Sequence, residues 1–146
     1  MDAKTIFQPK IWYIICGAMA LLGGIENNIN AENWAESAWG TDGVNDQTVA
    51  MEVLFGVFMV GFGAMGLVCA FLLEGKVQAR FAMANGGVMI AFFVLLFVML
   101  GETGYNFPSA AFLAPPFVLF GGLIASGYLH MNCLLYTSPS PRDFAI

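Results

Sequence analysis

Four long runs of apolar residues follow one another along this chain, separated by short polar segments. They cover residues 6–25, 47–73, 79–100 and 109–129. An α-helix rises about 1.5 Å per residue, so about 20 apolar residues are needed to cross a hydrocarbon core of about 30 Å. The pattern therefore predicts an all-α, polytopic membrane protein, in which residues 1–131 form a bundle of four transmembrane helices.

The first run is the least regular of the four. Pro9 and Lys10 stand in its opening turn, where proline costs no helical hydrogen bond and lysine can extend toward the lipid headgroups. A cleaved signal peptide is the alternative interpretation. The sequence Gly23-Gly24-Ile25-Glu26 is a poor cleavage site, which favours a retained helix.

The polar segment after the first run has a pattern of its own. Residues 30–39 can form two helical turns, and Trp34 is of the kind that anchors a helix at headgroup depth. We therefore predict a short helix on the outer membrane surface, with a disordered acidic loop as the alternative. Gly40 is expected to end this helix, and Asp46 or Thr48 to cap the next one.

The composition supports a lipid environment. Hydrophobic residues make up 59% of the 146 residues and charged residues 10%, with a mean hydropathy of +0.76. Soluble domains contain about 25% charged residues, so water is an unsuitable solvent for most of this surface. The net charge of −5 excludes a nucleic-acid partner, which would need clustered basic residues.

The basic residues indicate an orientation in the membrane. The segment 26–46 holds five acidic residues and no basic one, and the segment 101–108 also has no basic residue. Because lysine and arginine in short loops remain on the cytoplasmic side, both termini are expected in the cytoplasm, with a bacterial inner membrane or an organellar membrane as the location. The basic residues before the tail are Lys4, Lys10, Lys76 and Arg80.

The tail differs in character from the rest of the chain. From Cys133 to Asp143 it resembles the translated adapter sequence that ends reading frames assembled from short sequencing reads. Residues 132–146 are therefore expected to be non-native or disordered. A genuine Ser/Pro-rich cytoplasmic tail is the alternative.

Small residues are concentrated within the apolar runs. Glu52, Gly56, Gly63 and Gly66 recur at helical spacing on one face of the second run. Helices in lipid associate where small residues let their backbones approach, so this face is expected to point into the bundle. Gly121 marks a similar face on the fourth run.

Glu52 is the main candidate for function, because an ionisable residue facing the interior of a membrane bundle is costly. Glu26 and Asn27, after the first run, and Glu102 and Tyr105, after the third, are expected at the same depth. Together these groups could hold a cation or a polar headgroup. The alternative for Glu52 is an acid that stabilises a helix N-terminus.

Other chemistry is sparse. Gln78 and Asn85 lie seven residues apart, on one face of the third helix near the inner side, where they could hydrogen-bond to another helix. The residues show no metal-ligand spacing, no catalytic set and no feature that would name a cofactor. An enzymatic function is therefore not expected.

The layout is similar to that of the small four-helix membrane proteins of the DoxX-like superfamily. The resemblance covers residues 11–129 and rests on a short first span, an outer loop with a surface helix, a glycine-rich second span that ends at a basic turn, and a Pro-containing loop between the last two spans. Many such proteins have no established activity, and the resemblance implies a link to quinone or thiol redox partners.

Three functions stay open. The first is an accessory or scaffold protein that packs through its glycine faces against a larger membrane complex or a second copy of itself. The second is a transporter or a protein that binds an ion or lipid through Glu52. The third is a redox partner protein of the DoxX-like kind. In all three the lipid bilayer is the principal partner.

Overall fold

The computed structural model describes residues 3–107 and 110–131, and every regular element in this part of the chain is helical. The prediction of an all-α protein is therefore confirmed. The tail, residues 132–146, lies outside the described residues. The elements in chain order are α1 (Ala3–Ile6), α2 (Pro9–Ile29), α3 (Ala31–Trp39), the 3-10 turn η1 (Thr41–Gly43), α4 (Asp46–Leu72), α5 (Gly75–Gly101) and α6 (Ala110–Met131).

Three of these helices are long and apolar enough to cross a membrane. They are Asp46–Leu72, Gly75–Gly101 and Leu113–Met131, which correspond to α4, α5 and most of α6. The first predicted run corresponds to α2, which has 21 residues but is not among the three. Its apolar middle is flanked by Lys10 at one end and by the polar run Glu26-Asn27-Asn28 at the other.

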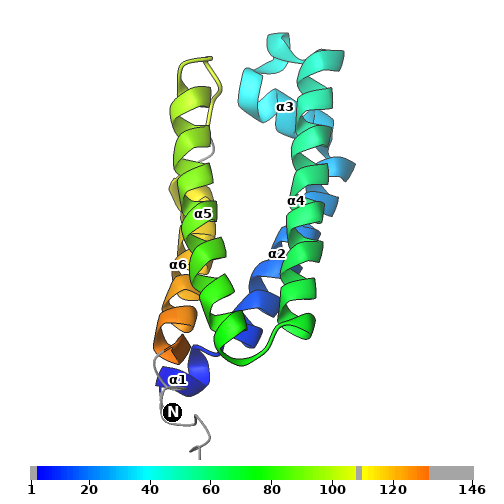
Figure 1. Cartoon of the computed structure of the whole chain (residues 1–146). Helices are drawn as coiled ribbons and strands as arrows, with labels where there is room; N and C mark the ends of the chain where they lie inside the picture. The colour runs from blue at the N-terminus through cyan, green and yellow to red at the C-terminus, as the bar shows by residue number, and fades with distance from the viewer. Residues whose placement is uncertain (1–2, 108–109, 132–146) are drawn as a thin grey trace, which may run out of the picture.

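The helices form two antiparallel pairs (Figure 1). One pair is α2 with α4, and the other is α5 with α6. The pairs meet at the end that holds α1 and the α4–α5 turn, which we call the inner end, and diverge toward the end that holds α3 and the α5–α6 loop, the outer end. α2 also contacts α6: Cys16 Sγ donates to the carbonyl of Leu119, 3.5 Å away.

The contact between α2 and α4 depends on glycine. A Cβ atom on Gly63 would lie 2.6 Å from the backbone nitrogen of Leu21 and 2.7 Å from the carbonyl oxygen of Gly17. A Cβ on Gly24 would lie 2.6 Å from the carbonyl oxygen of Gly56. Both distances are shorter than real side chains tolerate, so the two backbones approach as closely as they do only because these positions lack a side chain.

The pair α5 and α6 is packed in two ways. A Cβ on Gly86 would lie 2.6 Å from Ile124 Cγ1 and 2.8 Å from the carbonyl oxygen of Phe120, so backbone approach matters here too. Aromatic rings fill the rest: Phe93 contacts Phe120 and Phe117, with ring centroids 5.9 and 6.4 Å apart. These contacts make α5 and α6 a unit that is separate from α2 and α4 at the outer end.

The beginning of α4 corrects one prediction. The N-cap is Asn45, and neither Asp46 nor Thr48 holds that place. Asn45 Oδ1 accepts from the backbone nitrogens of Gln47 at 2.9 Å and Thr48 at 3.1 Å, while Thr48 Oγ1 accepts from the backbone nitrogen of Asn45 at 3.0 Å. This reciprocal pair satisfies more backbone donors than a cap at Asp46 would, because Thr48 then stands at the third helical position.

Apolar side chains cover the outward faces of the long helices. Phe58 and Met65 of α4 are 57% and 61% exposed, and Val88 and Leu95 of α5 are 66% and 58% exposed. Exposed apolar side chains in such numbers are unfavourable in water. The faces are suited to hydrocarbon, in agreement with the three candidate spans.

The α2–α4 contact predicts a contrast between two glycines of α4. Gly63→Ala should destabilise the fold by about 1–3 kcal/mol, because the new Cβ meets backbone atoms that cannot move aside. Gly61→Ala is the matched control, since a Cβ there meets nothing within 4 Å. Thermal unfolding of both variants in the same detergent is the measurement, and equal melting temperatures would contradict the close contact.

Candidate functional site

The outer end of α4 holds a buried carboxylate. Glu52 lies in the second turn of the helix and is 5% exposed. Tyr105, in the loop after α5, donates its hydroxyl to Glu52 Oε1 at 3.3 Å. Asn27 Nδ2, near the end of α2, donates to the backbone carbonyl of Glu52 at 2.7 Å. Three separate segments of the chain therefore meet at this residue.

No basic side chain neutralises Glu52 within the described residues. Lys10 stands in the first turn of α2, and Lys76 and Arg80 stand at the start of α5, all at the inner end. α4 has 27 residues, so the two ends of the helix are about 40 Å apart. The carboxylate is thus removed from water without an ion-pair partner, an arrangement that is costly unless a proton or another cation balances the charge.

Tyr105 is itself enclosed. Its ring meets Trp39 of α3 edge to face, with centroids 5.3 Å apart, and lies 5.1 Å from the ring of Phe107. Burial, together with the negative charge of Glu52 beside the hydroxyl, raises the pKa of Tyr105 to about 12. The phenol therefore stays protonated at neutral pH and acts as a hydrogen-bond donor.

Two polar atoms near this site have no hydrogen-bond partner. Asn28 Oδ1 and Trp39 Nε1 are both buried and unpaired in the described part of the chain. A Cβ on Gly56 would lie 2.6 Å from Asn28 Oδ1, so this amide rests on α4 one turn after Glu52. Buried polar atoms are almost always paired, so these two atoms are exceptions at the outer end of the molecule.

The structure brings together three of the five residues that the sequence analysis grouped here. Glu52, Asn27 and Tyr105 are in contact. Glu26 is exposed and instead accepts from Asn30 Nδ2 at 2.9 Å and from Trp34 Nε1 at 3.1 Å. It faces away because adjacent helical residues point about 100° apart around the axis. Glu102 is exposed at the end of α5.

The sequence analysis missed two residues of the site. Trp39 covers Tyr105, and Asn106 attaches the α5–α6 loop to α3: its backbone nitrogen donates to Ala38 O at 2.8 Å. Neither contact has a local signature, because the partners are almost 70 residues apart in the chain. A tryptophan at the end of a short outer helix was the single available signal.

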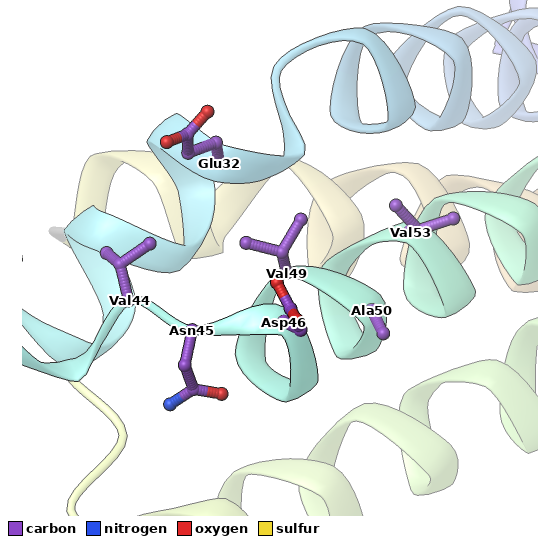
Figure 2. A pocket seen from close by; sticks show the side chains of 7 residues that line it. All are labelled: Glu32, Val44, Asn45, Asp46, Val49, Ala50 and Val53. Carbon is purple, nitrogen blue, oxygen red and sulfur yellow. The ribbon is translucent and has the colours of Figure 1, made fainter.

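A groove on the outer surface lies apart from Glu52 (Figure 2). It has a volume of about 630 Å³ and is bordered by α3, the segment before α4, and the first two turns of α4. Its walls are mostly valine and alanine, with Glu32 and Asp46 at its edge, and Glu52 is not part of its lining. The lining residues are Glu32, Val44, Asn45, Asp46, Val49, Ala50 and Val53.

The inner polar residues join helices. Gln78 Nε2 donates to the carbonyl oxygens of Cys69 at 3.1 Å and Ala70 at 3.2 Å, which satisfies acceptors at the end of α4. Asn85 Nδ2 donates to the hydroxyl of Tyr13 in α2 at 3.0 Å. The two residues thus belong to separate contacts, and both hold the inner end together.

The packing glycines also have definite places. Gly56 and Gly63 lie between α2 and α4, and Gly66 lies there too, since a Cβ on it would be 3.2 Å from Gly17 Cα. A Cβ on Gly121 would meet nothing within 4 Å.

Among the described residues, no group of three or more His, Cys, Asp or Glu side chains could hold a metal ion.

Comparison with protein-family models, with curated proteins and with solved structures finds no match to this chain.

The bond between Tyr105 and Glu52 predicts a pH effect. Tyr105→Phe should cost about 0.5–1.5 kcal/mol at neutral pH through the lost hydrogen bond. The pKa of the folded-state phenol, about 12, lies above its ordinary value of 10.0, so wild-type stability should fall as the pH rises from 10 toward 12. The variant lacks this contribution, and its stability should fall less over the same range. Denaturation at a series of pH values checks this, and parallel curves would contradict it.

Proposed function

We propose that this chain is an integral membrane protein that binds a single positive charge, either a proton or an alkali cation, at Glu52. The observation that carries the proposal is a carboxylate that is 5% exposed, at the outer end of an apolar 27-residue helix, with every described basic residue at the other end. Ionisable groups in such positions commonly belong to ion or proton pathways. This is chemistry of the transporter or ion-binding type.

The donor set favours a monovalent ligand. Glu52 provides one negative charge, and the Tyr105 hydroxyl is a neutral oxygen atom 3.3 Å from its carboxylate. Ca²⁺ and Mg²⁺ are generally bound by several oxygen ligands that include more than one carboxylate or a phosphate. A single buried carboxylate is balanced by one proton or one alkali cation.

The proposed membrane arrangement has four spans. α2 packs against α4, and its outward side carries the apolar residues Ile15, Met19 and Leu22. A helix of 21 residues is about 31 Å long, which matches a hydrocarbon core of about 30 Å. With the basic residues on the cytoplasmic side, both termini lie inside and Glu52 lies near the opposite surface.

The scaffold hypothesis has less support from the geometry. Gly56, Gly63 and Gly66 are occupied by the contact with α2, so they are not free to bind a larger complex. The redox hypothesis rests on the DoxX-like resemblance and on Cys16 and Cys69, which are free, buried cysteines. Both hypotheses stay predictions.

Carbodiimide labelling tests the proposal. Dicyclohexylcarbodiimide enters lipid and reacts with protonated carboxyl groups, so Glu52 in nanodiscs should be labelled faster as the pH is lowered. An alkali cation that binds there should slow the labelling when Na⁺ replaces choline at constant ionic strength. A response to pH alone identifies a proton site, and a response to Na⁺ identifies a cation site. Peptide mass spectrometry locates the label.

Two variants sharpen this experiment. Glu52→Gln should lose both the label and any Na⁺-dependent rise in melting temperature. Glu102→Gln is the matched control, because Glu102 is exposed at the same end of the molecule, and this variant should behave as the wild type. Labelling of Glu52 that ignores both pH and Na⁺ would overturn the proposed function.

A further inference from the structure

Tyr105, in the described part of the loop between α5 and α6, contacts the Glu52 carboxylate through its hydroxyl. We infer that the described part of this loop, residues 102–107, which we call the outer loop, is the gate through which the Glu52 site exchanges with the outer aqueous phase. The inference rests on the proposed function, because it concerns access to the same site. Glu52 is 5% exposed while the Tyr105 hydroxyl lies on its carboxylate, so a ligand from the aqueous side needs this contact to open.

Hydrogen bonds and ring contacts hold the outer loop closed, among them an edge-to-face contact of Phe107 with Phe97 of α5 at a centroid distance of 5.1 Å. Besides the bond from Tyr105 to Glu52, Asn106 donates its backbone nitrogen to Ala38 O at 2.8 Å and its side-chain amide to Ser37 O at 3.4 Å. The ring contact between Trp39 and Tyr105 completes the attachment to α3. All of these are surface or half-buried contacts, which belong to the part of a structure that opens most easily.

The outer loop begins with a natural hinge. Gly104 has a φ of +81°, a conformation that glycine adopts readily, and it immediately precedes Tyr105. A Cβ on Gly104 or on Gly101 would meet nothing within 4 Å, so neither position is confined by neighbours. Thr103, between these two glycines, donates its Oγ1 to Leu100 O at 2.7 Å, and this bond fixes the C-terminal end of α5. Backbone rotation is therefore expected at Gly104.

The helices beside the outer loop do not oppose its movement. α4 and α5 follow each other in the chain, yet they diverge toward the outer end (Figure 1). Phe62 of α4 and Phe92 of α5 contact each other with ring centroids 6.1 Å apart. The links of the α5–α6 pair to α2, such as Asn85 to Tyr13, lie toward the inner end. Opening the outer loop therefore breaks no helix–helix interface.

The closed form also leaves a donor unpaired. Trp39 Nε1 is buried without a hydrogen-bond partner while its ring rests against Tyr105. Release of the outer loop would let water reach this group, which offsets part of the cost of opening. The contact is thus of a kind that can form and break, unlike the glycine contacts between α2 and α4.

A reversible cross-link tests the gate. In a variant with the native cysteines replaced by alanine, Ser37→Cys and Asn106→Cys should form a disulfide on oxidation, because the Asn106 side-chain amide lies 3.4 Å from the Ser37 carbonyl oxygen. A water-soluble carbodiimide added outside sealed proteoliposomes should then label Glu52 about tenfold more slowly, and reduction should restore the rate. The singly substituted Ser37→Cys protein is the control and should show no effect of oxidation.

A second variant acts in the opposite direction. Asn106→Ala removes the side-chain bond to Ser37 O and should increase the rate of labelling several-fold without altering the overall melting temperature. Equal labelling rates in the oxidised, reduced and Asn106→Ala proteins would overturn the gate, as would failure of the disulfide to form. Neither result would change how pH or Na⁺ affects the rate at which lipid-soluble carbodiimide labels Glu52. The experiments can therefore reject the gate without rejecting the proposed function.

Discussion

Direct backbone contact between α2 and α4 is the constraint on which the rest of the structure depends. In lipid there is no hydrophobic driving force between apolar helices, so association relies on close packing and hydrogen bonds. Gly17, Gly24, Gly56 and Gly63 supply that packing, and they set the register of one helix against the other. The register places Asn27 against the backbone of Glu52, and the polar site is a consequence of it.

The two ends of the molecule are held in different ways. Toward the inner end, Tyr13 and Asn85 join α2 to α5, and Gln78 binds the last carbonyls of α4. At the outer end the two helix pairs diverge, and a short loop with polar contacts connects them. The proposed opening of the outer loop concerns the end that holds the buried carboxylate.

Glycines at the contact between α2 and α4 are used inside the molecule, so they do not form part of the surface that faces its surroundings. Gly56 and Gly63 are filled by the contact with α2, and much of the outward surface is made of large apolar side chains such as Phe58 and Leu95. Such a surface is well solvated by acyl chains. The protein therefore has its polar chemistry inside the helix pairs and at the outer end.

The sequence by itself determined the helices, the apolar surface and the face of α4 that carries Glu52, because these follow from local periodicity and composition. It also indicated Asn27 and Tyr105 as neighbours in depth. That Glu26 turns away and that Asn45 caps α4 follow from helical periodicity and a local capping box. The tertiary structure alone decided that Trp39 and Asn106 complete the site, because their partners lie almost 70 residues away in the chain and no local pattern encodes such contacts.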